Sequence, residues 1–271
     1  MPELPEVEST RRGLEPHVLG RRIRALLVHE PRLRWPVPAD LPAAVAGERI
    51  LTAGRRAKYL LFGLERATLL LHLGMSGSLR VLPADTPRLV HDHFDLLLET
   101  GLTLRFNDPR RFGSLHYLRG DPAEHPLLAQ LAPEPFDAAF DGEYLWRITR
   151  GRRVAIKQVL MNSRLVVGVG NIYASEALYQ AGIRPRRSAG SLSREQARRL
   201  ARAVRSVLEL AIRVGGTTLR DYVRVDGTPG EFREKLYVYE RAGAPCRVCG
   251  TAIRRITQLQ RSSYYCPHCQ R

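Results

Sequence analysis

The sequence predicts an α+β protein in which an antiparallel β-sheet region precedes a helical region and a small cysteine-rich element. Three observations support this class. Short apolar runs alternate with turn residues between positions 22 and 118, helical periodicity dominates from 153 to 213, and all four cysteines lie between 246 and 269. With 271 residues, the chain is long enough for two domains with separate hydrophobic cores.

A short helix is expected at the N-terminus, over residues 5–12. Pro5 suits the first helical turn, and Glu6 and Glu8 complement the positive end of the helix dipole. Gly13 is expected to end the helix, because glycine commonly follows the last helical residue.

Eight apolar runs follow and are predicted to be strands. In chain order they are RIRALLV, ERILTA, AKYLLFGL, ATLLLHL, GSLRVL, FDLLLE, LTLRF and SLHYL. Repeated short strands separated by turn residues are typical of an antiparallel sandwich or barrel. The Glu-Thr-Gly sequence at 99–101 predicts a hairpin connection between two of these strands.

The second half of the chain begins with a linker and continues with helices. Four prolines within residues 119–142 favour a connection between domains. Helices are predicted over 153–162 and 171–180, and a longer one begins at Ser193, where Gln196 completes a capping-box pattern. The glycine pair at 215 and 216 ends the long helix, which has an apolar stripe backed by arginines and receives no catalytic role.

Charge is distributed unevenly along the chain, whose net charge is +16. Residues 1–150 contain 20 Lys or Arg and 19 Asp or Glu, whereas residues 151–271 contain 23 and 8. An arginine-biased genome would explain the total but not the asymmetry, which favours a polyanionic partner for the second half. No apolar run is long enough to span a bilayer and the N-terminus is unlike a signal peptide, so we expect a cytoplasmic protein that does not enter membranes.

The four cysteines form two pairs, Cys246 with Cys249 and Cys266 with Cys269, separated by 16 residues. This spacing predicts one structural Zn²⁺ held by four thiolates, with two disulfides as the alternative. Arginines, but no acidic residue, lie between Thr251 and Gln270, so the hairpin between the pairs is a candidate phosphate contact.

The N-terminus offers a chemical group of its own. Removal of the initiator Met is expected before a small residue such as Pro2 and leaves a free secondary amine. An α-amino group titrates roughly two pH units below a lysine side chain, so more of it is unprotonated near neutral pH. Such an amine can act as a covalent nucleophile, and Glu3 and Glu6 are possible proton carriers beside it.

Several segments in chain order jointly resemble one family, the bacterial formamidopyrimidine-DNA glycosylases. The segments are MPELPEVE, RRAKYLL, HLGMSGSLR, HDHFD, NDPRRFG, VVGVGNIYASEAL, CRVCG and QRSSYYCPHCQ. The resemblance implies an N-terminal catalytic β-sandwich domain (1–135), a linker and helical helix-two-turn-helix domain (136–235) and a zinc finger (236–271). It also implies a nucleoid-associated monomer that binds damaged double-stranded DNA between its domains.

The resemblance further implies a bifunctional base-excision repair enzyme, a DNA glycosylase and AP lyase. Members of the family excise 8-oxoguanine and formamidopyrimidines and then cut the strand by β,δ-elimination. Pro2 would form the Schiff base, Glu3 would transfer protons, Lys58 would donate the proton for β-elimination, and Arg261 would grip a phosphate and assist δ-elimination. In a chain that has 40 arginines and only three lysines, a retained Lys58 suggests a need for a compact, titratable ammonium group.

DNA-binding residues are also implied by the resemblance. An extruded base leaves a gap that must be filled, and Met75, Arg110 and Phe112 match the residues that fill it in the family. Asn171, at the start of a helix after two glycines, matches a phosphate contact. His91 and Arg152 occupy positions that contact DNA in relatives.

One departure and three alternatives accompany this interpretation. Glu231 stands where we expect an aromatic residue in many relatives, so no lesion contact is assigned within residues 217–231. The sister family of endonuclease VIII type, which favours oxidised pyrimidines, is the main alternative, although the complete NDPRRFG segment favours the purine enzyme. A non-catalytic binder of distorted DNA and a zinc-ribbon protein that binds RNA or ribosomes are the others.

Overall fold

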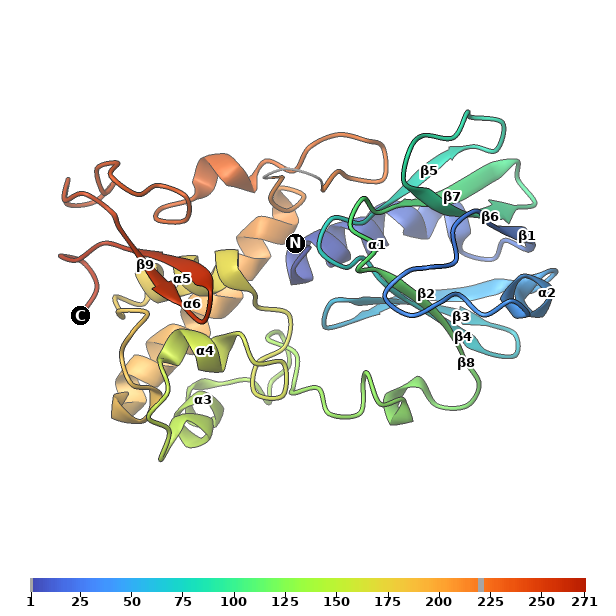
Figure 1. Cartoon of the computed structure of the whole chain (residues 1–271). Coiled ribbons are helices and arrows are strands. Elements are labelled where there is room, and N and C mark those ends of the chain that lie inside the picture. The colour runs from blue at the N-terminus through green and yellow to red at the C-terminus, as the bar shows by residue number, and fades with distance from the viewer. Residues whose placement is uncertain (1, 219–221) are drawn as a thin grey trace. The chain divides into compact units, whose positions relative to one another are not determined.

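The computed structural model describes residues 2–218 and 222–271 (Figure 1). The chain forms two compact units. The first, the sheet unit, comprises Met1–Ala129 and Val214–Arg233, and the second, the helical unit, comprises Gln130–Arg213 and Glu234–Arg271. Each unit is therefore built from two segments that are distant in sequence, while the domain bounds expected from the sequence stay a prediction.

The sheet unit contains two four-stranded antiparallel sheets. One has the order β1 (Ile23–Val28), β6 (Asp92–Leu98), β7 (Leu102–Asn107) and β5 (Ser78–Pro83). The other has the order β2 (Ile50–Arg56), β3 (Tyr59–Leu64), β4 (Thr68–His72) and β8 (Ser114–Leu118). All eight predicted strands are present, and the α+β class is confirmed.

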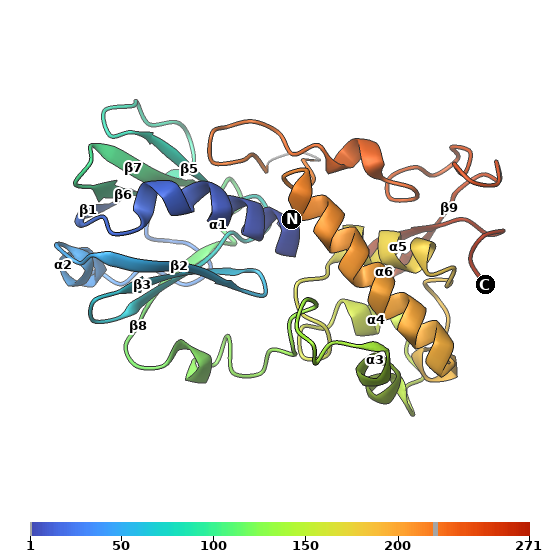
Figure 2. The ribbon, with the colours of Figure 1, turned by 180° about the vertical axis from the view of Figure 1, so that it is seen from behind.

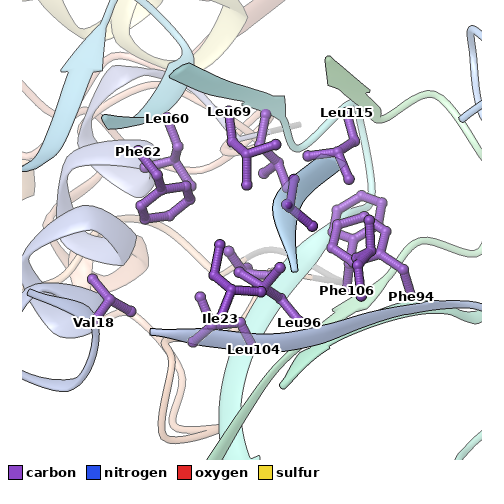
Figure 3. Close-up of a cluster of buried hydrophobic side chains, with 14 of the residues drawn as sticks. Val18, Ile23, Leu60, Phe62, Leu69, Phe94, Leu96, Leu104, Phe106 and Leu115 are labelled. Carbon is purple, nitrogen blue, oxygen red and sulfur yellow. The ribbon is translucent and has the colours of Figure 1, made fainter. Parts of the chain in front are cut away.

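A single apolar core is shared by the two sheets (Figure 3). Ile23, Leu96 and Leu104 come from one sheet and meet Leu60 and Leu69 of the other, and all five are less than 5% exposed. The strands alternate between inward and outward side chains, so each sheet presents one apolar face to this core. The arrangement is a sandwich, which decides between the two architectures that the apolar runs allowed.

The first helix is longer than predicted. Helix α1 runs over Leu4–Val18 and contacts strands of both sheets. The expectation that Gly13 ends it is wrong, because the helix continues to Val18. Glycine is needed at this position because a Cβ at Gly13 would lie 2.5 Å from Cγ2 of Val225. Gly13 is thus a point of close packing inside a helix. A short helix α2 (Leu41–Val45) and a 3₁₀ turn η1 (Pro122–Glu124) were not expected from the sequence.

The helical unit contains four α-helices and a hairpin within its described residues. They are α3 (Gly142–Thr149), α4 (Ile156–Leu160), α5 (Asn171–Gln180), α6 (Arg194–Arg213), β9 (Arg254–Gln258) and β10 (Arg261–Tyr265), with a 3₁₀ turn η2 (Ala189–Ser191). A further 3₁₀ turn, η3 (Phe232–Lys235), contains the sequence boundary between Arg233 of the sheet unit and Glu234 of the helical unit. Helix α6 packs against α3 and α5 (Figure 2).

The sequence predicted these helices with unequal success. Helix α5 has the predicted bounds, and α6 begins with the expected capping box, in which the Ser193 amide donates to Gln196 Oε1 at 3.0 Å. Helix α4 is shorter than the predicted 153–162, and α3 was not predicted. Throughout the described ranges, no helix combines the length and apolar character needed to cross a bilayer.

Candidate functional site

The N-terminal residues are held by a reciprocal capping box. Glu3 is the N-cap of α1, and its carboxylate accepts a hydrogen bond from the backbone N–H of Glu6. In return, the backbone N–H of Glu3 donates to Glu6 Oε2 at 2.7 Å. Both carboxylates are 1% exposed, and Pro2 is buried beside them. The structure therefore fixes Pro2 and Glu3 together at the start of a helix.

Glu6 also fastens a segment that lies more than two hundred residues away. Its Oε1 accepts a hydrogen bond of 2.7 Å from the Thr217 amide, and its backbone carbonyl accepts one of 3.1 Å from the Tyr222 hydroxyl. Burial, together with the Glu6 carboxylate, raises the pKa of Tyr222 well above its usual range, so the phenol stays a donor. Gly216 has a φ of +83° where the segment passes Glu6.

The loop in which Glu231 departs from expectation belongs to this same segment. Glu231 pairs with Thr217 in an isolated bridge, and its Oε1 lies 3.7 Å from a guanidinium nitrogen of Arg224. The Glu231 side chain is 72% exposed. The unassigned range 217–231 includes residues 219–221, which lie outside the described residues. The acid at 231 thus serves an ion pair along the loop.

Lys58 lies in the turn between β2 and β3, directly after Ala57, whose φ is +53°. His72 ends β4 and pairs with Tyr59 in the ladder. Burial, then the charges of Lys58 and Arg34, lower the pKa of His72 to about 4. The imidazole is consequently neutral at neutral pH, and its Nδ1 accepts a 3.0 Å hydrogen bond from the Gly74 amide.

Two loops are joined by Asp108, a fully buried residue that the sequence analysis did not single out. The Asp108 carboxylate accepts hydrogen bonds from Ser76 Oγ at 2.6 Å, from the Gly113 amide at 2.8 Å and from the Arg110 amide at 3.3 Å. A Cβ at Gly74 would lie 2.5 Å from the backbone of Phe112, so only glycine allows this approach. The loops at 74–77 and 108–113 are therefore one rigid element.

This element carries the three residues predicted to fill the gap in DNA. Met75 and Phe112 are 38% and 39% exposed, so each of the two loops presents a large apolar side chain to solvent. The Arg110 guanidinium lies 4.8 Å from the centroid of the Phe112 ring. The structure thus brings Met75, Arg110 and Phe112 onto neighbouring loops with exposed side chains.

His91 is exposed on the loop before β6 and has a φ of +72°. Its backbone carbonyl accepts a 3.1 Å hydrogen bond from the Asp108 amide, which attaches it to the same element. The buried Arg105 donates to the Thr86 and Pro87 carbonyls at 2.9 and 3.0 Å and stiffens the loop. A buried arginine thereby supports the presentation of His91.

In the helical unit, Asn171 belongs to a network centred on Lys157. The Lys157 ammonium is 2% exposed and donates to Asn171 Oδ1 and Ser263 Oγ, both at 2.7 Å, and to the Ser262 carbonyl at 3.2 Å. Asn171 Nδ2 donates to the Tyr239 hydroxyl at 3.3 Å. Lys157 therefore ties the start of α5 to the strand that begins with Arg261. The retention of lysine in an arginine-rich chain, used for Lys58, was the signal that could have found it.

Arg152 lies in the exposed loop between α3 and α4. Its Nε donates to the Ile148 carbonyl at 2.6 Å, and its own carbonyl accepts from the Gly190 amide at 2.8 Å. These contacts attach the loop to α3 and to η2, and they do not join Arg152 to the Lys157 network.

A second buried glutamate, Glu176, holds the segment that leads into the finger. Its carboxylate accepts hydrogen bonds from the amides of Tyr237, Val238 and Tyr239 at 2.9, 3.0 and 2.8 Å. Burial raises the pKa of Glu176, although the three amides act in the opposite direction.

The four cysteine sulfurs converge at one point, with all ligand atoms within 4.8 Å of one another. Cys246 and Cys269 have sulfurs 3.9 Å apart, and those of Cys249 and Cys266 are 3.5 Å apart. Tetrahedral zinc with Zn–S bonds of about 2.3 Å requires sulfurs about 3.8 Å apart, whereas a disulfide requires about 2 Å. The residues therefore fit one structural Zn²⁺, and the disulfide alternative is excluded for these four thiols.

Helix α5 also supports the zinc site. The Tyr179 hydroxyl lies 3.2 Å from Cys246 Sγ. Burial raises the pKa of the Cys246 thiol, but hydrogen bonds from Tyr179 and from the amides of Val248 and Cys249 outweigh it, so the pKa of this thiol lies below its usual value. The thiolate that zinc binds is thus favoured by neighbours of the ligand.

Comparison with known proteins decides the family. The formamidopyrimidine-DNA glycosylase N-terminal domain matches residues 1–115, the H2TH domain of the same enzymes matches 131–223, and the zinc finger found in FPG and IleRS matches 243–271. The formamidopyrimidine-DNA glycosylase of Thioalkalivibrio sulfidiphilus is 58% identical over 271 residues, all of both chains. This chain belongs to the formamidopyrimidine-DNA glycosylase family. The homologue from Hahella chejuensis is 56% identical, again over both whole chains.

Solved structures of the family have the same fold. The MutM (FPG) protein of Thermus thermophilus is 43% identical, with a TM-score of 0.89 over 99% of this chain and 98% of that one. A Lactococcus lactis FPG mutant in complex with DNA containing Fapy-dG is 32% identical, with a TM-score of 0.93 over the whole of both chains. The expected resemblance, the enzyme class and the zinc finger are confirmed.

Proposed function

We propose that this glycosylase family member is bifunctional: it excises 8-oxoguanine and formamidopyrimidines from damaged double-stranded DNA and then cuts the strand as an AP lyase by β,δ-elimination. The capping box that Glu3 and Glu6 form directly after Pro2 is the observation that carries the proposal. Burying two carboxylates beside the N-terminus costs free energy, and a protein that only binds DNA does not need such buried carboxylates. That cost is understandable where an amine must be held in one position and exchange protons.

The chemistry begins at the Pro2 nitrogen. Its lone pair attacks C1′ of the damaged nucleotide, the glycosidic bond breaks, and the base leaves with the bonding electrons and takes up a proton. Glu3 delivers a proton to the sugar ring oxygen as the ring opens to an iminium. Loss of a C2′ proton then expels the 3′ phosphate, a second elimination expels the 5′ phosphate, and water releases Pro2. Lys58 protonates the group that leaves in the first elimination.

Arg261 stabilises the departing phosphate in the second elimination electrostatically, since guanidinium groups remain protonated in proteins. Met75, Arg110 and Phe112 fill the space left by the extruded base and oppose its return. Asn171, His91 and Arg152 contact phosphates. The rigid attachment of the loops by Asp108 supports these roles, because a wedge must keep its shape against a stacked duplex.

Borohydride trapping tests the proposal. The protein is incubated with a duplex carrying 8-oxoguanine opposite cytosine, and reduction of the iminium is expected to give a covalent protein–DNA adduct. Pro2→Gly should abolish or strongly reduce trapping. A matched control adds one residue before Pro2, which converts the Pro2 nitrogen to an amide, keeps the proline ring and moves the free amine one residue away, and it should also fail to trap.

Two outcomes would contradict the proposal. The first is the absence of an adduct with the wild-type protein, and the second is trapping by the extended protein at the wild-type level. A parallel duplex with an oxidised pyrimidine separates the purine reaction from that of the sister family, because the purine lesion should be excised faster.

A further inference from the structure

The tip of the β9–β10 hairpin has an unexpected composition for its geometry. Arg261 pairs with Gln258, so only Leu259 and Gln260 form the turn. Their φ angles are +45° and +59°. A two-residue turn with both φ angles positive strongly favours asparagine, aspartate and glycine. Neither Leu259 nor Gln260 is one of these preferred residues.

The Leu259 side chain gains little from the protein in return. It is 73% exposed, which is among the highest values for a large apolar side chain in the described chain. A γ-branched apolar residue with positive φ is strained, and such residues persist where function uses them. Neither a packed core nor the turn itself explains leucine at this position.

The surroundings indicate what Leu259 contacts. A pocket of about 290 Å³ is lined by residues of the hairpin and of α4 and its C-terminal end, among them the apolar Leu259 and Met161 and the polar Arg261 and Ser263. No acidic residue occurs from Thr251 to Gln270. Apolar side chains and a guanidinium in one pocket whose lining has no acidic residue match a nucleotide, whose sugar is largely apolar and whose phosphate is anionic.

We propose that Leu259 is an apolar DNA contact that packs against the deoxyribose and base edge of the nucleotide whose phosphate Arg261 holds. The strained turn projects the side chain to the hairpin tip, and the pocket beside it receives that one nucleotide. This inference rests on the proposed function, because it requires that the protein bind damaged duplex DNA. It adds a contact made by burial of apolar surface to a site otherwise described by charge.

Equilibrium binding of variants tests the inference. Fluorescence anisotropy is measured with a labelled duplex containing a tetrahydrofuran abasic analogue, at several salt concentrations, alongside thermal unfolding. Leu259→Asn gives the turn a preferred residue and removes the apolar side chain, so we expect Tm to be unchanged or higher and affinity to fall about tenfold. Leu259→Met keeps an apolar side chain and should stay within about twofold of wild type.

Two further variants separate the possible causes. Gln260→Asn relieves strain at the other turn position and should keep wild-type affinity. Arg261→Gln should lower the slope of log K against log salt by about one, whereas Leu259→Asn should leave that slope unchanged because it removes no phosphate contact.

Wild-type affinity of Leu259→Asn would overturn the inference, and so would a clear fall in its Tm, which would show that Leu259 stabilises the finger. If the wild-type protein itself fails to bind the duplex, the proposed function fails. If the wild type binds and Leu259→Asn binds equally well, only the present inference fails.

Discussion

Glu6 of the sheet unit and Glu176 of the helical unit both hold backbone amides in place through a buried carboxylate, but from different positions in their helices. Each is a buried carboxylate on a helix that accepts hydrogen bonds from backbone amides. Glu6 accepts from the N-cap residue Glu3 and from the distant Thr217, whereas Glu176 accepts from three consecutive amides of one distant segment. Glu6 lies in the first turn of α1, where the helix dipole favours an anion, whereas Glu176 lies in the interior of α5. Burial raises the pKa of Glu176.

The difference between these glutamates shows how the two units separate their work. In the sheet unit the carboxylate fixes the chain terminus that bears the proposed nucleophile, so its position matters for chemistry. In the helical unit the carboxylate fixes the entry to the zinc finger, so we expect its position to affect DNA affinity. Variants that affect one unit and spare the other test this division.

Removal of zinc should have the largest effect and should be confined to the helical unit. Structural zinc contributes about 10–16 kcal/mol to the folding of isolated finger peptides. Treatment with a strong chelator, or Cys246→Ser, should unfold the hairpin and let trypsin cleave after the exposed arginines at 254, 255 and 261, while cleavage within residues 2–129 remains slow. Uniform acceleration of cleavage in both units would contradict the division.

Acidification should weaken the sheet unit through His72. The pKa of His72 is about 4 in the folded protein and about 6.5 in an unfolded chain, so the unfolded state binds the proton more tightly. The contribution of neutral His72 to the free energy of unfolding is fully present above pH 6.5. It is lost progressively as the pH falls from 6.5 through 4, and the total loss is about 3 kcal/mol.

Paired pH titrations of unfolding measure this contribution. His72→Gln should show a shallower loss of stability than wild type between pH 6.5 and 4. Zinc release at low pH affects both proteins equally and cancels in their difference. The pKa of Glu176 is raised in the folded protein, so its protonation at low pH favours the folded state and partly offsets the loss of stability. Glu176→Gln should therefore make stability fall more steeply as the pH is lowered. Parallel curves for wild type and His72→Gln would show that His72 does not titrate in this range.

Replacing either glutamate by glutamine compares the two tasks directly. One acceptor oxygen becomes an amide donor that faces a backbone N–H, so each variant should lose about 1–3 kcal/mol of stability. Glu6→Gln should also reduce borohydride trapping, because Glu3 and Pro2 lose their fixed position, while Glu176→Gln should raise Kd and leave trapping at saturating DNA unchanged. Equal trapping defects in both variants would argue against separate roles.

Two glycines give the smallest and most specific test. A Cβ at Gly13 meets the Val225 side chain, whereas a Cβ at Gly142 would lie 2.6 Å from Cα of Arg198. Gly13→Ala should cost about 1–3 kcal/mol, and adding Val225→Ala should recover it and leave the helix-propensity gain of about 1 kcal/mol over glycine. Gly142→Ala should not be rescued by Arg198→Ala, because backbone blocks it. Rescue at both positions, measured by urea unfolding, would show that α3 and α6 can separate slightly.

Local patterns in the sequence were sufficient for much of the fold. The eight strands, α5 and the start of α6 were predicted because alternation, helical period and capping residues act over a few positions. The bounds of α1 were missed because Gly13 is a helix breaker by local preference, and only its contact with Val225 explains why it lies inside the helix. Tertiary packing overrides local propensity at such points.

By itself, the sequence determined the zinc ligands, the amine of Pro2 as a candidate nucleophile and the basic character of the second half, because residue type and spacing carry that chemistry. Only the tertiary structure revealed that Glu6 holds Thr217, that Asp108 joins two loops and that Lys157 links Asn171 to Ser263. The physical reason is that many of these partners are backbone amides or small polar groups. Almost every residue offers them, so no sequence pattern marks which ones a buried charge will find after the chain has folded.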